Sequence, residues 1–200
     1  MSLSSRMVIV LTAVGIISGG LLSTVGILTR ARIEANRLRE IEEAIITVVP
    51  GAKTNTKIYE EKDFTVYTTR NDQGQIQGFA IYTAGTGFQD KIVLMFGTDA
   101  EINKIFRLTI LDQKETPGLG AKITDKEAFL KYWENKDCSH PLMLKKPPVA
   151  QEELGASEVN AITGATISSE AVLATVNASL AKLRSLIQAG TIQIEENNGQ

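Results

Sequence analysis

Hydroxyl side chains cluster in the stretch Ala161–Ser169, AITGATISS, immediately ahead of a predicted helix. Apolar residues recur at three- and four-residue steps from Val172 to Ile187, which predicts a long amphipathic helix ended by Gly190. Thr166 is therefore expected at or near the N-cap, where the first backbone N–H groups are unpaired and the helix dipole is positive. Such a position favours a phosphate group, although a Thr cap also opens many ordinary helices.

The residues next to Thr166 suit a phosphorylated ligand. Gly164 and Ala165 carry little bulk, so a large group can lie against the backbone there. Ser168 and Ser169 supply further hydrogen-bond donors. From this stretch alone, simple capping and phosphate binding both stay open.

A second stretch, KETPGLGAK from Lys114 to Lys122, has the chemistry of a turn. Pro117 and Gly118 fit the central positions of a type II turn, because proline presets φ at the first and glycine accepts a positive φ at the second. Gly120 follows, so Leu119 is the only side chain between two glycines. Such a loop presents bare backbone and one apolar group, which suits the face of a flat aromatic ligand.

A third stretch, AGTGFQDK from Ala84 to Lys91, places two glycines directly after a predicted strand. It lacks the G-x-G-x-x-G spacing and the following helix of a dinucleotide site. We interpret it as a connection that borders a ligand.

Catalysis by side chains alone has little support in the composition. His140 is the single histidine and Cys138 the single cysteine, which disfavours triad chemistry and excludes an internal disulfide. A four-ligand metal site would need several carboxylates, and none is predicted. The net charge of -2 with scattered basic residues also disfavours nucleic-acid binding.

The segment Met7–Leu28 contains no charged residue over 22 positions. At about 1.5 Å per residue such a helix spans the roughly 30 Å hydrocarbon layer of a membrane. The polar continuation lacks a small-residue cleavage site, so we expect a retained anchor over residues 1–29.

The rest of the chain predicts one α+β domain with an antiparallel sheet and flanking helices. A juxtamembrane helix is expected over residues 30–50, then a domain over 51–190 and a flexible tail over 191–200. With 43% hydrophobic residues the chain can bury one sizeable core. The strand patterns are FTVYTTR and GQIQGFAIYT as a hairpin, then KIVLMFG and KIFRLTIL. Thr124 and Glu127 form a capping-box pattern that predicts a helix of about three turns.

These motifs, taken in order, resemble a known family. A membrane helix at the start is followed by TGFQDKIVLMFGTD, ETPGLGAKI and NAITGATISS ahead of the last helix. This order is similar to that of the FMN-binding G subunit of the Rnf ion-translocating electron-transport complex. The related C subunit of the sodium-translocating NADH:quinone reductase shares the domain. The resemblance covers nearly the whole chain.

The resemblance implies that Thr166, the last threonine of the [S/T]-G-A-T motif, carries FMN covalently through a phosphoester. It also implies that the T-P-G-L-G loop lies near the flavin. No catalytic residue beyond the flavin and no metal is implied. Two positions depart from the family, because Asn160 stands where Asp is usual and Gln113 where histidine is common. The implied cofactor-binding residues are Thr166, Thr163, Gly164, Ala165, Ser168, Thr116, Pro117, Gly118, Leu119 and Gly120.

The function implied by the resemblance is electron transfer within a membrane-bound ion-translocating ferredoxin:NAD oxidoreductase, a translocase. The chain would be a redox subunit with no complete activity alone. Its implied partners are the other membrane and iron–sulfur subunits, with a flavin transferase for maturation. Family members are single-pass proteins of the cell inner (plasma) membrane with the FMN domain on the extracytoplasmic side. The four arginines that follow the apolar helix, counted alone, favour the cytoplasm instead.

Two alternatives stay open at this stage. One keeps the covalent FMN but places the chain in a sodium-translocating NADH:quinone reductase or another extracytoplasmic flavin electron chain. The other is a non-redox, membrane-anchored binding or assembly module in which Thr166 only caps a helix.

Overall fold

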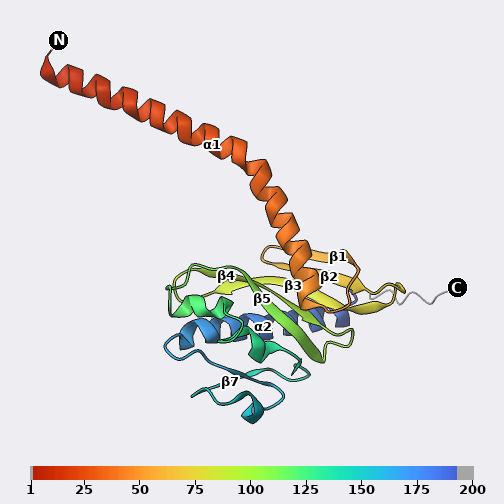
Figure 1. The fold of residues 1–200 in the computed structure, drawn as a ribbon. Helices are drawn as coiled ribbons and strands as arrows, with labels where there is room; N and C mark the ends of the chain where they lie inside the picture. The colour runs from red at the N-terminus through yellow and green to blue at the C-terminus, as the bar shows by residue number, and fades with distance from the viewer. Residues whose placement is uncertain (1, 193–200) are drawn as a thin grey trace. The chain divides into compact units, whose positions relative to one another are not determined.

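The computed structural model describes residues 2–192, which divide into two units at Glu42/Glu43. The first unit is the greater part of α1, a helix that runs from Leu3 to Val48 (Figure 1). Within the described residues, α1 is the one helix long and apolar enough to cross a membrane. Its large apolar side chains from Met7 to Leu28 are exposed. That exposure fits a lipid surrounding.

The second unit contains a six-stranded antiparallel sheet in which each strand pairs with its sequence neighbour. The predicted meander and its hairpin across Asn71–Gly74 are confirmed. Short turns connect the strands from β1 to β5, whereas residues 113–135 separate β5 from β6. The strands are β1 (Thr54–Glu61), β2 (Phe64–Arg70), β3 (Ile76–Thr86), β4 (Lys91–Thr98), β5 (Lys104–Asp112) and β6 (Lys136–Asp137).

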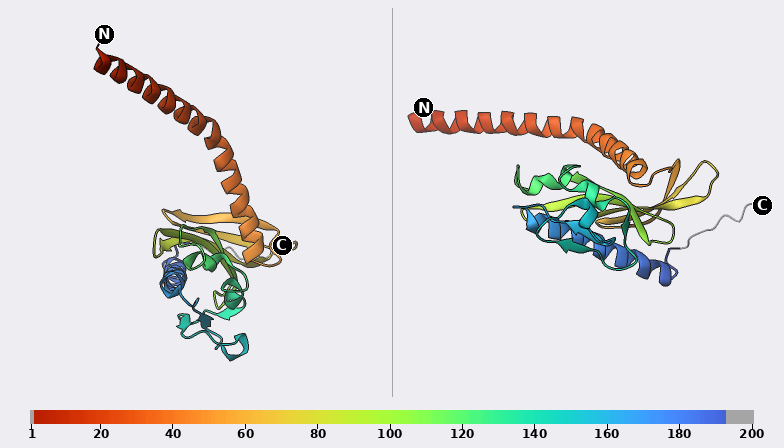
Figure 2. Two further views of the ribbon diagram at one scale, coloured as in Figure 1. Left: turned by 60° about the vertical axis from the view of Figure 1, so that its left-hand side comes forward. Right: turned by 60° about the horizontal axis from the view of Figure 1, so that its bottom comes forward.

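Helix α2 (Thr166–Gln188) lies along one face of this sheet, as Figure 2 shows. Its buried apolar side chains sit at the predicted spacing, and Gly190 follows with a φ of 68°. On β4, Ile92, Leu94 and Phe96 are fully buried with α2 in the main core. Because successive side chains of a strand alternate between faces, Met95 and Gly97 face the other way. There the last turn of α1 packs, with Ile45 and Val48 buried.

The remaining elements are short. A two-stranded parallel sheet pairs β7 (Met143–Lys145) with β8 (Glu158–Asn160). Three 3₁₀ helices occur at η1 (Gly120–Thr124), η2 (Leu130–Trp133) and η3 (Gln151–Glu153). Apart from β6 and β7, the segment from 135 to 148 contains no helix or strand.

The three-turn helix predicted from Thr124 is wrong. Thr124 Oγ1 donates to the Ala121 carbonyl 2.9 Å away and so closes η1. The competing cap is Asp125, whose Oδ1 accepts from the backbone N–H groups of Glu127 and Ala128 at 2.8 Å each. Although this is the arrangement of a helix N-cap, the backbone bonds that follow Asp125 form turns and not a regular helix. Only the single turn η2 forms beyond them.

Candidate functional site

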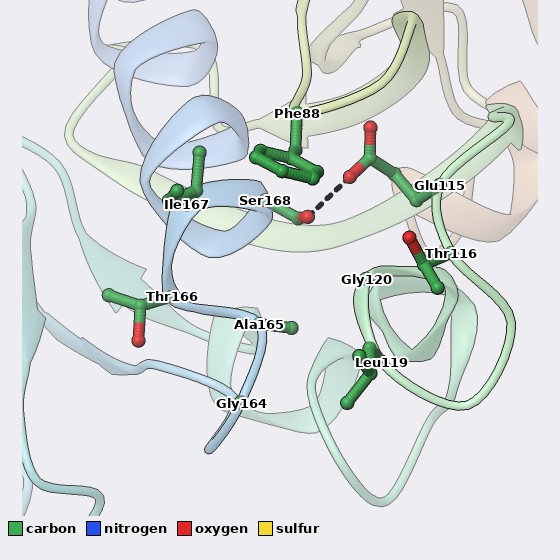
Figure 3. Close-up of a pocket in the computed structure, with 10 residues that line it drawn as sticks. All are labelled: Phe88, Glu115, Thr116, Leu119, Gly120, Gly164, Ala165, Thr166, Ile167 and Ser168. Atoms are coloured by element: carbon green, nitrogen blue, oxygen red, sulfur yellow. Dashed lines mark hydrogen bonds between the residues drawn. The ribbon is translucent and has the colours of Figure 1, made fainter.

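A cavity of about 330 Å³ opens where the start of α2 faces the loop that follows β5 and the loop that follows β3 (Figure 3). This volume falls in the range of small-molecule sites, roughly 300–1,000 Å³. Ten residues line it: Phe88, Glu115, Thr116, Leu119, Gly120, Gly164, Ala165, Thr166, Ile167 and Ser168.

The loop after β5 forms the predicted type II turn. The N–H of Leu119 donates to the Thr116 carbonyl at 3.1 Å, and Gly118 between them has a φ of 78°. Gly120 then approaches α2 closely, since a Cβ there would lie 2.6 Å from Ser168 Oγ. The glycine therefore lets this loop and the helix form two walls of one cavity.

The wall contributed by α2 carries three hydroxyls in different states. Ser169 Oγ is buried, donates to the Ala165 carbonyl at 3.0 Å and accepts from the Ile162 N–H at 3.0 Å. Ser168 Oγ is buried and donates to Glu115 Oε2 at 2.5 Å. Thr166 Oγ1 has no hydrogen-bond partner among the described residues and is half-buried. Thr166 is thus the hydroxyl of this turn that is free to react.

Thr166 is the first residue of α2, and Ala165 occupies the N-cap without a side-chain cap. The simple capping role is therefore not observed. Within the described part of the chain, no carbonyl accepts from the backbone N–H groups of Thr166, Ile167 or Ser168. These unpaired donors and the helix dipole make the start of α2 suitable for an anion.

Glu115 is a site residue that the sequence did not single out. Its side chain is only 4% exposed. Burial raises the pKa of this carboxyl, but hydrogen bonds from Ser168 and from the backbone of the 88–90 loop outweigh burial. The pKa of Glu115 therefore lies below its ordinary value, and the carboxylate is ionised at neutral pH.

Exposed apolar side chains surround the cavity. Phe88 is 61% exposed, Ile167 54% and Leu119 48%. Five large apolar side chains are exposed in the described part of the second unit, and these three of them line one cavity. A cluster of this kind marks a ligand or partner surface. Together with the unpaired N–H groups at the start of α2, it fits a flat aromatic group that bears a phosphate.

The structure brings most of the predicted site residues together. Thr116, Leu119, Gly120, Gly164, Ala165, Thr166 and Ser168 line the cavity. The predicted residues Thr163, Pro117 and Gly118 belong to the same two loops but lie outside the lining. Phe88, Glu115 and Ile167 were missed. Of these, Phe88 had a sequence signal, because it follows the two glycines of the connection after β3.

Both departures from the family have structural roles here. Asn160 is buried, and its side-chain amide accepts from the Val149 N–H at 3.1 Å and donates to the Val149 carbonyl at 2.7 Å. An aspartate could not donate the second bond. Gln113 Oε1 accepts from the Glu115 N–H at 2.6 Å and so supports the backbone of the carboxylate residue. Among the described residues, no group of His, Cys, Asp and Glu is arranged to hold a metal.

Comparisons with known proteins agree with this geometry. Residues 87–181 match the FMN-binding domain family. The chain is 25% identical over 178 residues to the G subunit of the ion-translocating oxidoreductase complex of Methanosarcina acetivorans, and the match covers 84% of this chain and 88% of the relative. It is 31% identical over 121 residues to the G subunit of the Na(+)-translocating ferredoxin:NAD(+) oxidoreductase complex of Acetobacterium woodii, covering 60% of this chain and 55% of that relative.

The fold also matches a solved structure. NqrC from Shewanella oneidensis superposes with a TM-score of 0.51 and 19% identity, covering 70% of this chain and 73% of NqrC. The chain therefore shares the α+β fold of that structure. The resemblance to the G subunits of the ion-translocating complexes, predicted from the motifs, is confirmed.

Proposed function

We propose that the chain carries FMN on Thr166 and transfers electrons as a subunit of a membrane-bound ion-translocating ferredoxin:NAD oxidoreductase complex. The observation that carries the proposal is the free Thr166 hydroxyl at the start of α2. Ser168 and Ser169, which share its helical turn, already donate their hydroxyl protons to Glu115 and to the Ala165 carbonyl. In the proposed linkage Thr166 Oγ1 bonds to the phosphate of FMN, with the formal loss of water.

The cavity supports the rest of the cofactor. The phosphodiester keeps one negative charge at the unpaired N–H groups of α2, where the helix dipole favours it by about 0.3–1 kcal/mol. So small a term does not retain a cofactor, which makes a covalent tether physically reasonable. Phe88, Leu119 and Ile167 offer apolar contact to a ring system and exclude water from it. When bound, FMN supplies one- and two-electron transfer, so the chain needs no acid–base set of its own.

The membrane arrangement follows the same proposal. Residues 1–29 form a single-pass anchor in the inner (plasma) membrane, 30–50 the juxtamembrane helix, and 51–190 the FMN domain on the extracytoplasmic side. The proposed tail over 191–200 lies outside the described residues from 193 onward. Partners are the other subunits of the complex, and a flavin transferase installs the FMN. The relatives named above as subunits of ion-translocating complexes support this assignment.

The test is mass spectrometry of the full chain coexpressed with a flavin transferase. The proposal expects the peptide that contains Thr166 to gain the mass of FMN less one water, with the added group on Thr166. The same peptide from a Thr166→Ala chain should carry no addition. An unmodified Thr166 in chain taken from its native membrane would overturn the proposal.

A further inference from the structure

Glu115 is the one charged residue among the ten that line the cavity. Burying a carboxylate is unfavourable unless hydrogen bonds compensate for the lost water. With 4% of its surface exposed, Glu115 has little contact with solvent. The fold therefore holds a charge at a place where an uncharged residue would be easier to accommodate.

Each oxygen of the Glu115 carboxylate accepts a hydrogen bond. Oε1 accepts from the backbone N–H of Gln89 at 3.0 Å, and that group cannot accept in return. Oε2 accepts from Ser168 Oγ at 2.5 Å. Figure 3 shows this second bond crossing from the loop after β5 to the first turn of α2. An ionised carboxylate accepts at both oxygens and therefore suits these two donors.

We propose that Glu115 sets the reduction potential of the flavin, because its carboxylate fixes a negative charge in the cavity wall that opposes the addition of electrons. The inference rests on the proposed function, in which FMN occupies this cavity. Its physical basis is Coulomb repulsion between the fixed charge and the charge added on reduction. Glu115 is only 4% exposed, so little water lies beside its carboxylate to screen this repulsion.

Other charges close to the cavity do not duplicate this effect. Asp90 lies in the loop between β3 and β4. Its carboxylate is paired with Lys114 at 3.1 Å in an exposed ion pair. Glu170 lies one residue past Ser169 on α2, is exposed and pairs with Lys146. Each of these carboxylates has a cation beside it, whereas the bonds to Glu115 come from neutral donors.

The decisive variant is Glu115→Gln in the full chain loaded with FMN. Glutamine keeps the length and shape, accepts from the Gln89 N–H through its carbonyl and donates to Ser168 through its amide. The measurement is spectroelectrochemical titration of the bound flavin. We expect the equilibrium constant for reduction to rise at least tenfold, which is about 30 mV for a two-electron couple. The matched control is Glu170→Gln, which removes an equal charge outside the cavity and should leave the potential unchanged.

Ser168→Ala provides a second route if Glu115→Gln does not fold or take up flavin. That variant keeps the carboxylate but removes a hydrogen bond that spreads its charge, so the potential should fall. An unchanged or higher potential in Ser168→Ala, or an unchanged potential in loaded Glu115→Gln, would overturn the inference. A wild-type chain that carries no flavin would overturn the proposed function and this inference together. Flavin on Thr166 with a potential insensitive to Glu115 would overturn the inference alone.

Discussion

Gly85 in β3 packs directly against the side chain of Thr175 in α2. A Cβ at Gly85 would come within 1.9 Å of Thr175 Oγ1 and 3.0 Å of its Cβ. The absence of a side chain at Gly85 therefore sets how closely α2 approaches the sheet. Because Thr166 begins the same helix, this contact also helps to determine where the free hydroxyl stands.

Substituting alanine for Gly85 should lower the free energy of unfolding by about 1–3 kcal/mol, the usual range for overpacking a core. The measurement is urea unfolding of the full chain in detergent. The compensating change is Thr175→Ala, which removes Oγ1 and Cγ2. The double variant should recover part of the loss, and strictly additive effects would contradict the proposed steric cause.

Thr166→Ala should abolish flavin fluorescence in denaturing gels, whereas Thr166→Ser should retain a fluorescent band. The reason is that serine keeps the hydroxyl at the first position of α2. Ser169→Ala serves as the control, because that hydroxyl is buried and occupied. Retained fluorescence in Thr166→Ala would show that the flavin is attached elsewhere.

Ser169→Ala should lower the free energy of unfolding more than Thr166→Ala does. It removes the acceptor of the buried Ile162 N–H and the donor to the Ala165 carbonyl. Leaving a buried polar group unpaired costs about 1–3 kcal/mol. Thr166→Ala, by contrast, should change the unfolding free energy by no more than about 0.5 kcal/mol, because its hydroxyl makes no bond in the described structure. Equal losses in the two variants would contradict the assignment of hydrogen bonds.

Acid should weaken the wild-type domain through Glu115. The pKa of its carboxyl is lowered in the folded chain from an ordinary value of 4.5. The stability that Glu115 contributes is therefore fully present above that value and is lost as the pH falls through the lower, folded pKa. The difference in unfolding free energy between wild type and Glu115→Gln should shrink from about pH 7 to about pH 3. A constant difference over this interval would show that the carboxyl does not titrate differently on folding.

Cys138 should not react with a membrane-impermeant thiol reagent in the folded chain. It has no exposed surface, and burial raises the pKa of its thiol to about 12. Lys126→Cys adds a thiol at an exposed turn, and because Cys138 does not react, any labelling reports on the new thiol. On the proposed topology it should be labelled in intact cells. Labelling only after lysis would place the domain in the cytoplasm.

Much of the sheet could be predicted because its strands alternate or are β-branched and are separated by polar turns. The first strand was missed, since TNTKIYEE is an edge strand whose side chains are mostly exposed. An edge strand pairs on one side only, so burial imposes little pattern on it. The helix expected after Thr124 failed for another local reason, the competing turn made by the Asp125 side chain.

The candidate site could be predicted only where local chemistry marked it. Gly118 and Gly164 adopt positive φ values of 78° and 83°, and the glycines themselves indicated unusual backbone. Glu115 gave no such signal, because its importance comes from Ser168, 53 residues away along the chain. Contacts of this kind depend on how α2 docks on the sheet, which no local pattern encodes.

The order of the elements along the chain puts the proposed attachment residue after the whole sheet. Strands β1 to β6 all precede α2, which brings Thr166 and one wall of the cavity. A growing polypeptide on the ribosome thus completes its sheet before it possesses the acceptor. Under the proposed function, FMN can reach Thr166 only after every strand of the sheet has been synthesised.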